Sequence, residues 1–185
     1  MDRKKAILNT TLQLLTRQGF YATPMSQIAK EAGVAAGTIY HYFAGKEELI
    51  LSLRSEINDE IIKAIKENID IVSDAKTQFY QIWLHIFKFY VREPIKFQFI
   101  QQFDNSPYLS QLEGGQKEQL YLPLLEFMSE SYENGILKNL PVKILTSLVI
   151  SQIHTIVNLQ IADEEDITRE LLRDIIELSW ANILK

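Results

Sequence analysis

Residues 23–49 read TPMSQIAKEAGVAAGTIYHYFAGKEEL and contain two short helical patterns joined by the turn AGVA. Thr23 and Pro24 are a typical helix start, with Thr23 as the expected N-cap and Pro24 in the first turn. Gly33 is expected to close that helix, and a second short helix is expected over about Gly37–Phe43. Two short helices with a glycine in the turn, preceded by a longer helix, are typical of a helix-turn-helix.

The second short helix carries an unusual run of aromatic residues with polar tips. Ile39 and Phe43, four residues apart, are expected to face inward and hold the helix in place. Tyr40, His41 and Tyr42 are then expected to face outward, because their polar atoms need partners. In a helix-turn-helix the second helix enters the major groove of DNA, where its exposed side chains reach base edges. The run therefore predicts a DNA-contacting surface.

Residues on either side of this aromatic run fit the same role. Gly37 permits a close approach of the backbone to a duplex. Thr38 can bind a phosphate or contact a thymine methyl group. Lys46 follows the short helix and is expected to contact a phosphate at the start of the fourth helix.

Charge is distributed unevenly along the chain. The whole sequence has a net charge of −5, but residues 1–46 carry +4 and the other 139 residues carry −9. Such an asymmetry is typical of a basic binding domain on an acidic body. A modest cluster of solvated surface lysines is the alternative interpretation of the same numbers.

The rest of the chain is also predicted to be helical, which makes the fold class all-α. We expect a three-helix helix-turn-helix domain over residues 1–46, joined by a long helix to a larger helical-bundle domain over residues 47–185. Apolar residues spaced by three and four support each helix, and glycine or proline marks most of the ends. The expected helices outside the helix-turn-helix are one ending at Gly19, then Glu47–Asp70, Ala75–Arg92, Pro94–Phe103, one from beyond Gly114-Gly115 to Gly135, Pro141–Ile161, and Ile167–Leu184 with the acidic residues 163–166 as its cap.

The first fifty residues resemble the DNA-binding domain of TetR-family transcriptional regulators. ILNTTLQLLTRQGF (7–20) is similar to the first helix of that family, TPMSQIAKEAGV (23–34) to its second helix and turn, and GTIYHYFAGKEEL (37–49) to its recognition helix and the entry to helix four. The resemblance implies that DNA contacts come from Ser26, Ala36, Gly37, Thr38, Tyr40, His41, Tyr42 and Lys46. It also implies that helix four couples a small-molecule pocket in the body to the spacing of two DNA-binding domains.

Two positions depart from the family pattern. The turn commonly carries a serine followed by a lysine or arginine, where this chain has Ala35 and Ala36. Ala35 cannot cap the recognition helix with a side-chain oxygen, and Ala36 offers a methyl contact but no charge. Arg3, Lys4 and Lys5 either compensate for the missing charge or are solvated, and the sequence leaves both alternatives open.

The body of the chain is rich in aromatic residues at helical spacing, which form a plain core more often than a ligand site. Their density, with polar residues interspersed, favours an apolar cavity with a few polar anchors, which a small, largely apolar effector would fit. The residues predicted to line it are Trp83, His85, Phe87, Tyr90, Phe99, Gln102, Phe103, Phe127 and His154.

The final two helices, at about 141–161 and 167–184, are apolar around most of their circumference. A helix of this kind must be buried on more than one side, which a two-fold dimer would achieve. The resemblance also places dimerisation on these helices. Three roles are open to the polar residues Ser151, Gln152, His154 and Asn158: interface hydrogen bonds, pocket anchors or satisfied core groups, of which the last is the commonest.

Several other functions find little support. The three histidines are far apart, no nucleophile, phosphate-loop or metal-ligand motif occurs, and no cysteine is present, so we expect neither an enzyme nor a metal or cofactor.

No secretory signal is visible, and no uncharged run is expected to approach the roughly 20 residues of a membrane span, so we expect a cytoplasmic protein with no membrane contact. A helical adaptor that binds another protein through residues 40–42 is the alternative to a ligand-responsive, homodimeric DNA-binding repressor acting on a palindromic operator.

Overall fold

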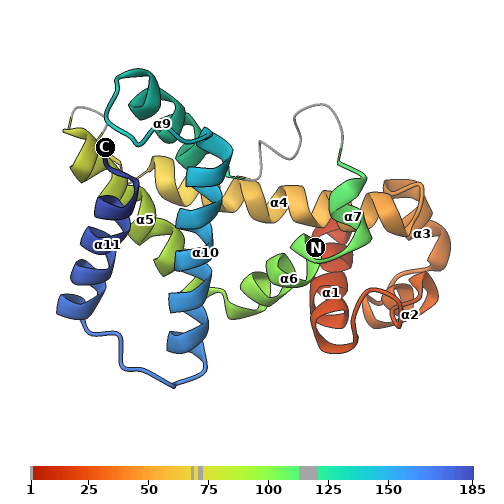
Figure 1. Ribbon diagram of the computed structural model, residues 1–185. Helices are drawn as coiled ribbons and strands as arrows, with labels where there is room; N and C mark the ends of the chain where they lie inside the picture. The colour runs from red at the N-terminus through yellow and green to blue at the C-terminus, as the bar shows by residue number, and fades with distance from the viewer. Residues whose placement is uncertain (1, 68, 71–72, 113–120) are drawn as a thin grey trace. The chain divides into compact units, whose positions relative to one another are not determined.

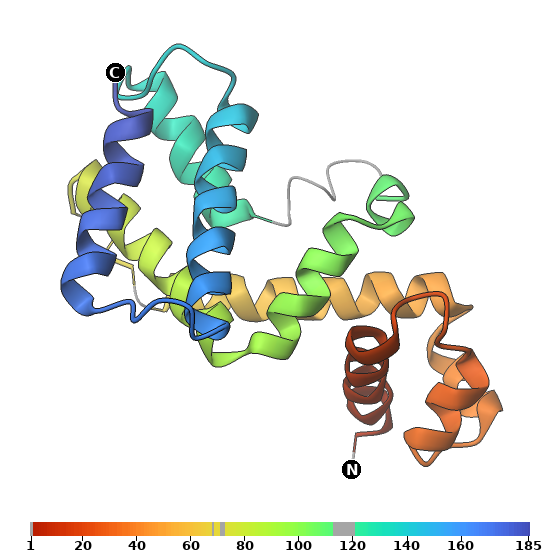
Figure 2. The ribbon, with the colours of Figure 1, turned by 60° about the horizontal axis from the view of Figure 1, so that its bottom comes forward.

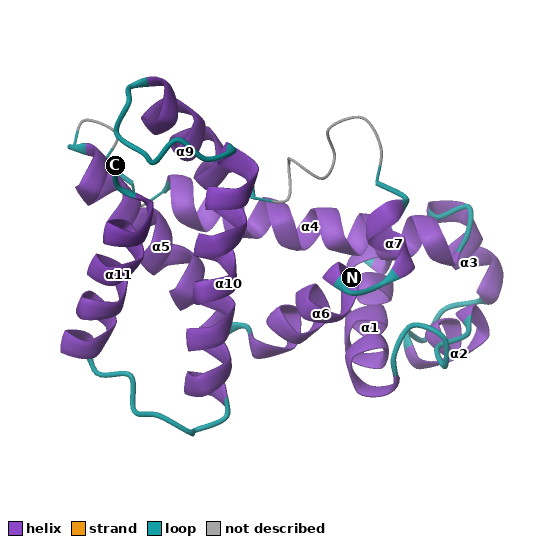
Figure 3. Cartoon of the chain, viewed as in Figure 1, coloured by secondary structure: helices purple, strands orange, loops and turns teal. Residues whose placement is uncertain are grey.

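The computed structural model describes residues 2–67, 69–70, 73–112 and 121–185 and confirms the all-α fold class. Figure 3 shows helices joined by loops throughout the coloured part of the chain. The helices are α1 (Arg3–Gln18), α2 (Met25–Glu31), α3 (Ala36–Tyr42), α4 (Lys46–Lys66), α5 (Ala75–Arg92), α6 (Pro94–Asp104), α7 (Pro107–Ser110), α9 (Leu122–Glu133), α10 (Val142–Ile161) and α11 (Arg169–Ile183).

The chain divides into two compact units that do not follow sequence order. The first unit contains Met1–Asp59 and Glu93–Lys117, and the second contains Glu60–Arg92 and Glu118–Lys185. The predicted domains, 1–46 and 47–185, are each one continuous stretch of sequence. Each compact unit instead combines two separate segments, and α6 and α7 belong with the N-terminal helices. Figure 1 labels the helices of both units.

The first unit is built around α1, which contacts α2, α3 and α6. Its apolar face is fully buried at Ile7, Leu14 and Leu15, and Ile28 of α2 is equally inaccessible to solvent. Gly19 ends α1 as predicted, with its backbone N–H donating to the Leu15 carbonyl. A short three-helix domain has a small core, so the packing of α6 on α1 gives this unit apolar contacts that the first 46 residues alone do not supply.

The second unit consists of α5, α9, α10, α11 and the last residues of α4. In it α10 packs on α5 and α9, and α11 packs on α5 and α10. Figure 2 shows α10 and α11 running side by side, as does Figure 1. Phe79, Phe127 and Trp180 form the aromatic centre, with ring centroids 5.2 to 6.5 Å apart. An isolated antiparallel bridge between Leu137 and Leu184 ties the chain end to the loop before α10.

Three predicted helix ends are wrong. Thr23 does not cap α2; Pro24 is the N-cap, and the Thr23 hydroxyl donates to the Gly19 carbonyl instead. Thr168, not the acidic run before it, caps α11 by accepting a hydrogen bond from the Leu171 N–H. Helix α4 ends at Lys66 rather than at about Asp70. The predicted interruption at Gly114-Gly115 lies outside the described residues.

Helix α10 corrects the expectation about apolar length. It is long and apolar enough to cross a membrane by length and composition, with 33% of its most apolar window buried, so the expectation that no run approaches a membrane span is wrong. A core helix of a globular bundle passes the same test, and α10 packs on three other helices of its unit. As its apolar circumference predicts, the core of one unit does not cover all of it: Ile144 and Leu148 remain 50% and 52% exposed.

Candidate DNA-binding surface

Helices α2 and α3 form the predicted helix-turn-helix. The turn between them is closed by Gly33, whose φ of +67° is a conformation that glycine adopts without strain. The next residue, Val34, donates its backbone N–H to the Ala29 carbonyl at 3.0 Å. This hydrogen bond ends α2 and turns the chain into α3, which begins two residues later.

The two faces of α3 are those that the sequence predicts. Ile39 and Phe43 are 1% and 2% exposed and hold the helix against the unit. Tyr40 is 57% exposed, Tyr42 is 38% exposed, and His41 is also exposed. The rings of His41 and Tyr42 meet edge to face at 5.3 Å, which limits the directions in which their polar tips can point.

The other predicted contact residues lie around the same short helix. Ala36 and Gly37 are exposed and Thr38 is half-buried, while Ser26 is exposed on α2. A Cβ atom added at Gly37 would meet nothing within 4 Å, so the free protein does not need glycine there for packing. The open space leaves room for a partner to approach the backbone closely, which is the role predicted for this glycine.

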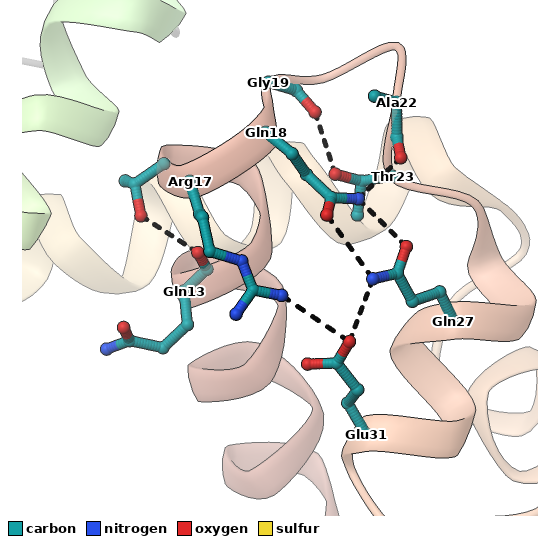
Figure 4. A network of polar contacts seen from close by, with 9 residues as sticks. Gln13, Arg17, Gln18, Gly19, Ala22, Thr23, Gln27 and Glu31 are labelled. Carbon is teal, nitrogen blue, oxygen red and sulfur yellow. Dashed lines mark hydrogen bonds and ion pairs between the residues drawn. The ribbon is translucent and has the colours of Figure 1, made fainter.

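A polar network joins the end of α1 to α2 and fixes the position of the helix-turn-helix on α1 (Figure 4). The Gln18 amide donates to the Gln27 side-chain oxygen at 2.9 Å and to the Ala22 carbonyl. Gln27 in turn donates to Glu31 at 2.9 Å, and Arg17 pairs with the same carboxylate at 3.7 Å. Arg17 and Glu31 are exposed, so their ion pair adds little stability, and the amide chain has the greater part in positioning α2.

Lys46 makes a contact that local sequence patterns do not show. Its ammonium group donates a hydrogen bond to the backbone carbonyl of Phe20, which lies 26 residues earlier in the loop after α1. Partial burial lowers the pKa of Lys46 from its usual range. In the free protein this lysine therefore ties the start of α4 to the end of α1, and its predicted phosphate contact stays a prediction.

Ala35 is the N-cap of α3 and, as expected, makes no side-chain capping hydrogen bond. Its φ of −66° and ψ of 146° are those of an ordinary N-cap, so a serine fits there without backbone change. We expect Ala35→Ser to raise the free energy of unfolding by about 0.5 to 2 kcal/mol, because its oxygen can accept the N–H of Gly37 or Thr38. Urea denaturation measures the change, and Ala36→Ser, one position inside the helix, is the control that should gain nothing comparable.

The residues predicted to line an effector site fall into both units. Trp83, Phe87, Tyr90 and Phe127 are at most 7% exposed, and with the half-buried His85 and His154 they belong to the second unit. The Trp83 and Phe87 rings stack at 5.7 Å, and the Tyr90 and His154 rings meet edge to face at 5.5 Å. His85 Nδ1 lies 2.6 Å from the Gln81 carbonyl oxygen, which fixes the ring along its own helix.

The indole N–H of Trp83 is an exception among these buried groups. Trp83 is fully buried, and its Nε1 atom has no hydrogen-bond partner among the described residues. A buried polar hydrogen without a partner is costly and needs an explanation.

Phe99, Gln102 and Phe103 of α6 lie instead in the first unit. Both phenylalanines are fully buried, and the Phe99 ring lies 6.0 Å from the ring of Phe20. The Gln102 amide donates to the backbone carbonyl of Thr16 in α1 at 3.2 Å. The guanidinium of the buried Arg54 in α4 lies 5.7 Å from the centre of the Phe103 ring. These three residues therefore join α6 to α1 and α4, a role that their spacing in the sequence does not reveal.

Comparison with known families matches both parts of the chain. Residues 7–53 match the family described as bacterial regulatory proteins, tetR family. Residues 75–184, more than half of the chain, match the tetracycline repressor-like C-terminal domain. The chain belongs to the TetR family. It is accordingly a DNA-binding transcriptional regulator and not an enzyme.

Relatives in the TetR family extend over the whole chain. An uncharacterized helix-turn-helix transcriptional regulator of Haemophilus influenzae is 28% identical over 100% of this chain and 97% of its own length. The crystal structure of a TetR-family regulator from Shewanella sp. PV-4 superposes with a TM-score of 0.89 at 27% identity and covers all of both chains. FadR of Bacillus subtilis, solved in complex with stearoyl-CoA, has the same fold, with a TM-score of 0.71 at 23% identity over 97% of this chain and 98% of its own.

Proposed function

We propose that this TetR-family chain is a cytoplasmic repressor that binds a palindromic operator as a homodimer and is released by a small, largely apolar effector. The observation that carries the proposal is the pair of faces on α3: Ile39 and Phe43 are buried, while Tyr40, His41 and Tyr42 are exposed in a row. A helix held in this way can enter a major groove without disturbing the core beneath it.

The contacts to DNA divide into two kinds. Tyr40 projects from the middle of α3 with more than half of its surface exposed, and its phenol is proposed to reach base edges. Tyr42 at the end of the helix, Ser26 on α2 and the backbone at Gly37 are proposed to contact phosphates. Ala36 contributes a methyl contact only.

Dimerisation is supported by apolar residues that the second unit leaves exposed. Ile144 and Leu148 lie four residues apart on α10, and Leu171 and Leu178 lie seven apart on α11, so each pair shares one helix face. Leu178 is 62% exposed and Leu171 is 40% exposed. A two-fold contact between copies buries both pairs at once, since each surface meets its own equivalent. Half-sites of the operator are then expected about 10 bp, or a multiple of that, apart.

The effector is proposed to bind in the second unit. Trp83 supplies a buried hydrogen-bond donor there, amid apolar and aromatic side chains. Those groups suit a ligand that is mostly apolar and carries one hydrogen-bond acceptor. FadR of B. subtilis, which has this fold, was solved with stearoyl-CoA, a ligand with a long apolar chain.

Fluorescence anisotropy on the DNA immediately upstream of the gene for this chain tests the proposal. We expect specific binding that weakens steeply with salt, by about 0.9 log units in affinity per log unit of salt for each phosphate neutralised. Unrelated DNA is the control and should bind more weakly. A folded, dimeric sample that binds neither DNA would contradict the proposal and favour a protein-binding adaptor.

Substitutions in α3 separate the two kinds of contact. We expect Tyr42→Ala to weaken binding to operator and unrelated DNA alike, because a phosphate contact carries no sequence information. Tyr40→Ala should instead reduce the preference for the operator, by about 1 to 3 kcal/mol if the phenol reads a base edge. Titrations of both DNAs with each variant give the ratio of operator affinity to unrelated-DNA affinity for that variant. If both variants lose the same affinity on both DNAs, this assignment is refuted.

A further inference from the structure

The first turn of α1 carries three adjacent cations. The helix begins at Arg3, so Arg3, Lys4 and Lys5 all lie in that turn, and all three are exposed. The carboxylate of Asp2 caps the turn by accepting the N–H of Lys4 at 3.0 Å and that of Lys5 at 3.4 Å. The basic residues are therefore part of an ordered helix and not of a solvated arm.

Positive charge at this place is unfavourable for the helix alone. The N-terminus of a helix carries a partial positive charge that favours acidic side chains. Helices α4 and α11 have acidic residues in their first turns, whereas α1 has none. Among the ion pairs that the described residues form, none includes Arg3, Lys4 or Lys5. A polyanionic partner would offset this accumulation of charge.

The turn lies beside the end of the recognition helix. The Lys4 ammonium lies 5.9 Å from the centre of the Phe43 ring, and Phe43 is the residue that ends α3. Helices α1 and α3 are also in direct contact within the first unit. The ring of Tyr42, which is partly exposed, lies 6.3 Å from that of Phe43. Lys4 therefore lies beside the exposed surface that α3 presents, and Arg3 and Lys5 flank it in the same turn.

We propose that Arg3, Lys4 and Lys5 form a second phosphate-binding element. It supplies the positive charge toward the DNA phosphates that the uncharged side chain of Ala36 does not provide. The proposal rests on the proposed function, because it assumes that α3 faces DNA. It assigns this turn to the sugar-phosphate backbone beside the groove that α3 enters, so its contribution is electrostatic and independent of base sequence. The chain thereby keeps its affinity with an uncharged residue at the start of the recognition helix.

Salt titration with a charge-matched control tests the proposal. The probe is a fluorescein-labelled DNA duplex of random sequence, titrated at several NaCl concentrations. We expect the triple variant Arg3→Gln/Lys4→Gln/Lys5→Gln to reduce the slope of log affinity against log salt by about 5, because a bound homodimer loses six cations at about 0.9 for each phosphate contact. The control is Lys66→Gln/Lys88→Gln/Arg92→Gln, which removes three exposed cations of the second unit and gives the same net charge. It should leave the slope within about 1 of the wild-type value.

The alternative outcomes separate this proposal from the function on which it rests. If the affinity of the wild-type chain for DNA does not depend on salt, the proposed function is overturned, and the first-turn contact with it. A steep wild-type slope that the α1 triple variant preserves overturns only the first-turn contact. Equal reductions in the two triple variants also overturn it, because net charge then explains the result.

Thermal melting without DNA provides a second readout. Because the three cations oppose the helix dipole, the α1 triple variant should melt at the same temperature as the wild type or higher. A marked fall in its melting temperature would show that these residues stabilise the fold instead, and would count against the proposal.

Discussion

Replacing Leu148 and Leu178 by glutamate is expected to convert the proposed dimer to a monomer. The two leucines are 52% and 62% exposed, so about 1 kcal/mol of apolar burial remains available for each on association. Two-fold symmetry doubles the effect to four side chains, or about 4 kcal/mol, which is roughly a thousandfold in the dissociation constant. Burying the new carboxylates without partners would add to that loss.

Sedimentation velocity over a range of concentrations measures this change. Tyr21→Glu is the matched control, since Tyr21 is an 87% exposed aromatic residue of the first unit, outside the proposed interface. We expect the control to remain dimeric and the double variant to sediment as a monomer with much weaker operator binding. A dimeric double variant would refute the placement of the interface on α10 and α11.

Phe103→Ala is expected to destabilise the first unit strongly, although Phe103 lies far along the chain from the helix-turn-helix. The side chain is fully buried, and removing a buried phenylalanine ring costs about 3 to 5 kcal/mol. The buried guanidinium of Arg54 also loses the ring beside it. That is a large part of the roughly 5 to 15 kcal/mol that stabilises an ordinary domain. DNA binding should be lost with the fold of this unit.

Urea denaturation followed by circular dichroism, together with anisotropy on the operator, checks the prediction. Ile95→Ala on the same helix is the control, because Ile95 is 37% exposed and its loss should cost less than about 1 kcal/mol. If Phe103 lined an effector site instead, Phe103→Ala would alter effector affinity and leave the stability of the first unit nearly unchanged.

Features with a strong local pattern could be predicted from the sequence. The bounds of α5 are those predicted, Ala75–Arg92, because a continuous apolar stripe precedes a proline that helices rarely tolerate. The exposed and buried faces of α3 are also confirmed, since four-residue spacing alone separates Ile39 and Phe43 from the residues between them.

Contacts between distant segments could not be predicted in this way. Phe99 and Phe103 have the same aromatic, helical spacing as the residues of α5. Yet Phe99 packs on Phe20 and Phe103 lies beside Arg54 of α4, while Gln102 between them bonds to α1, all in the first unit. The hydrogen bond from Lys46 to the Phe20 carbonyl likewise depends on where the start of α4 meets the loop after α1. The observed caps of α2 and α11 also differ from the predicted ones, because the Thr23 hydroxyl donates to the Gly19 carbonyl and Thr168, two residues after the acidic run, caps α11.

The separation of the chain into two units also has a spectroscopic consequence. Both tryptophans, Trp83 and Trp180, lie in the second unit, while the aromatic residues exposed on α3 are tyrosines and a histidine. Intrinsic tryptophan emission therefore reports on the proposed effector-binding unit and should change little when the DNA-binding unit unfolds. Because the Trp83 indole is fully buried and its N–H has no partner in the described part of the chain, a ligand that accepts this hydrogen bond should shift the emission spectrum, so effectors can be screened without any label.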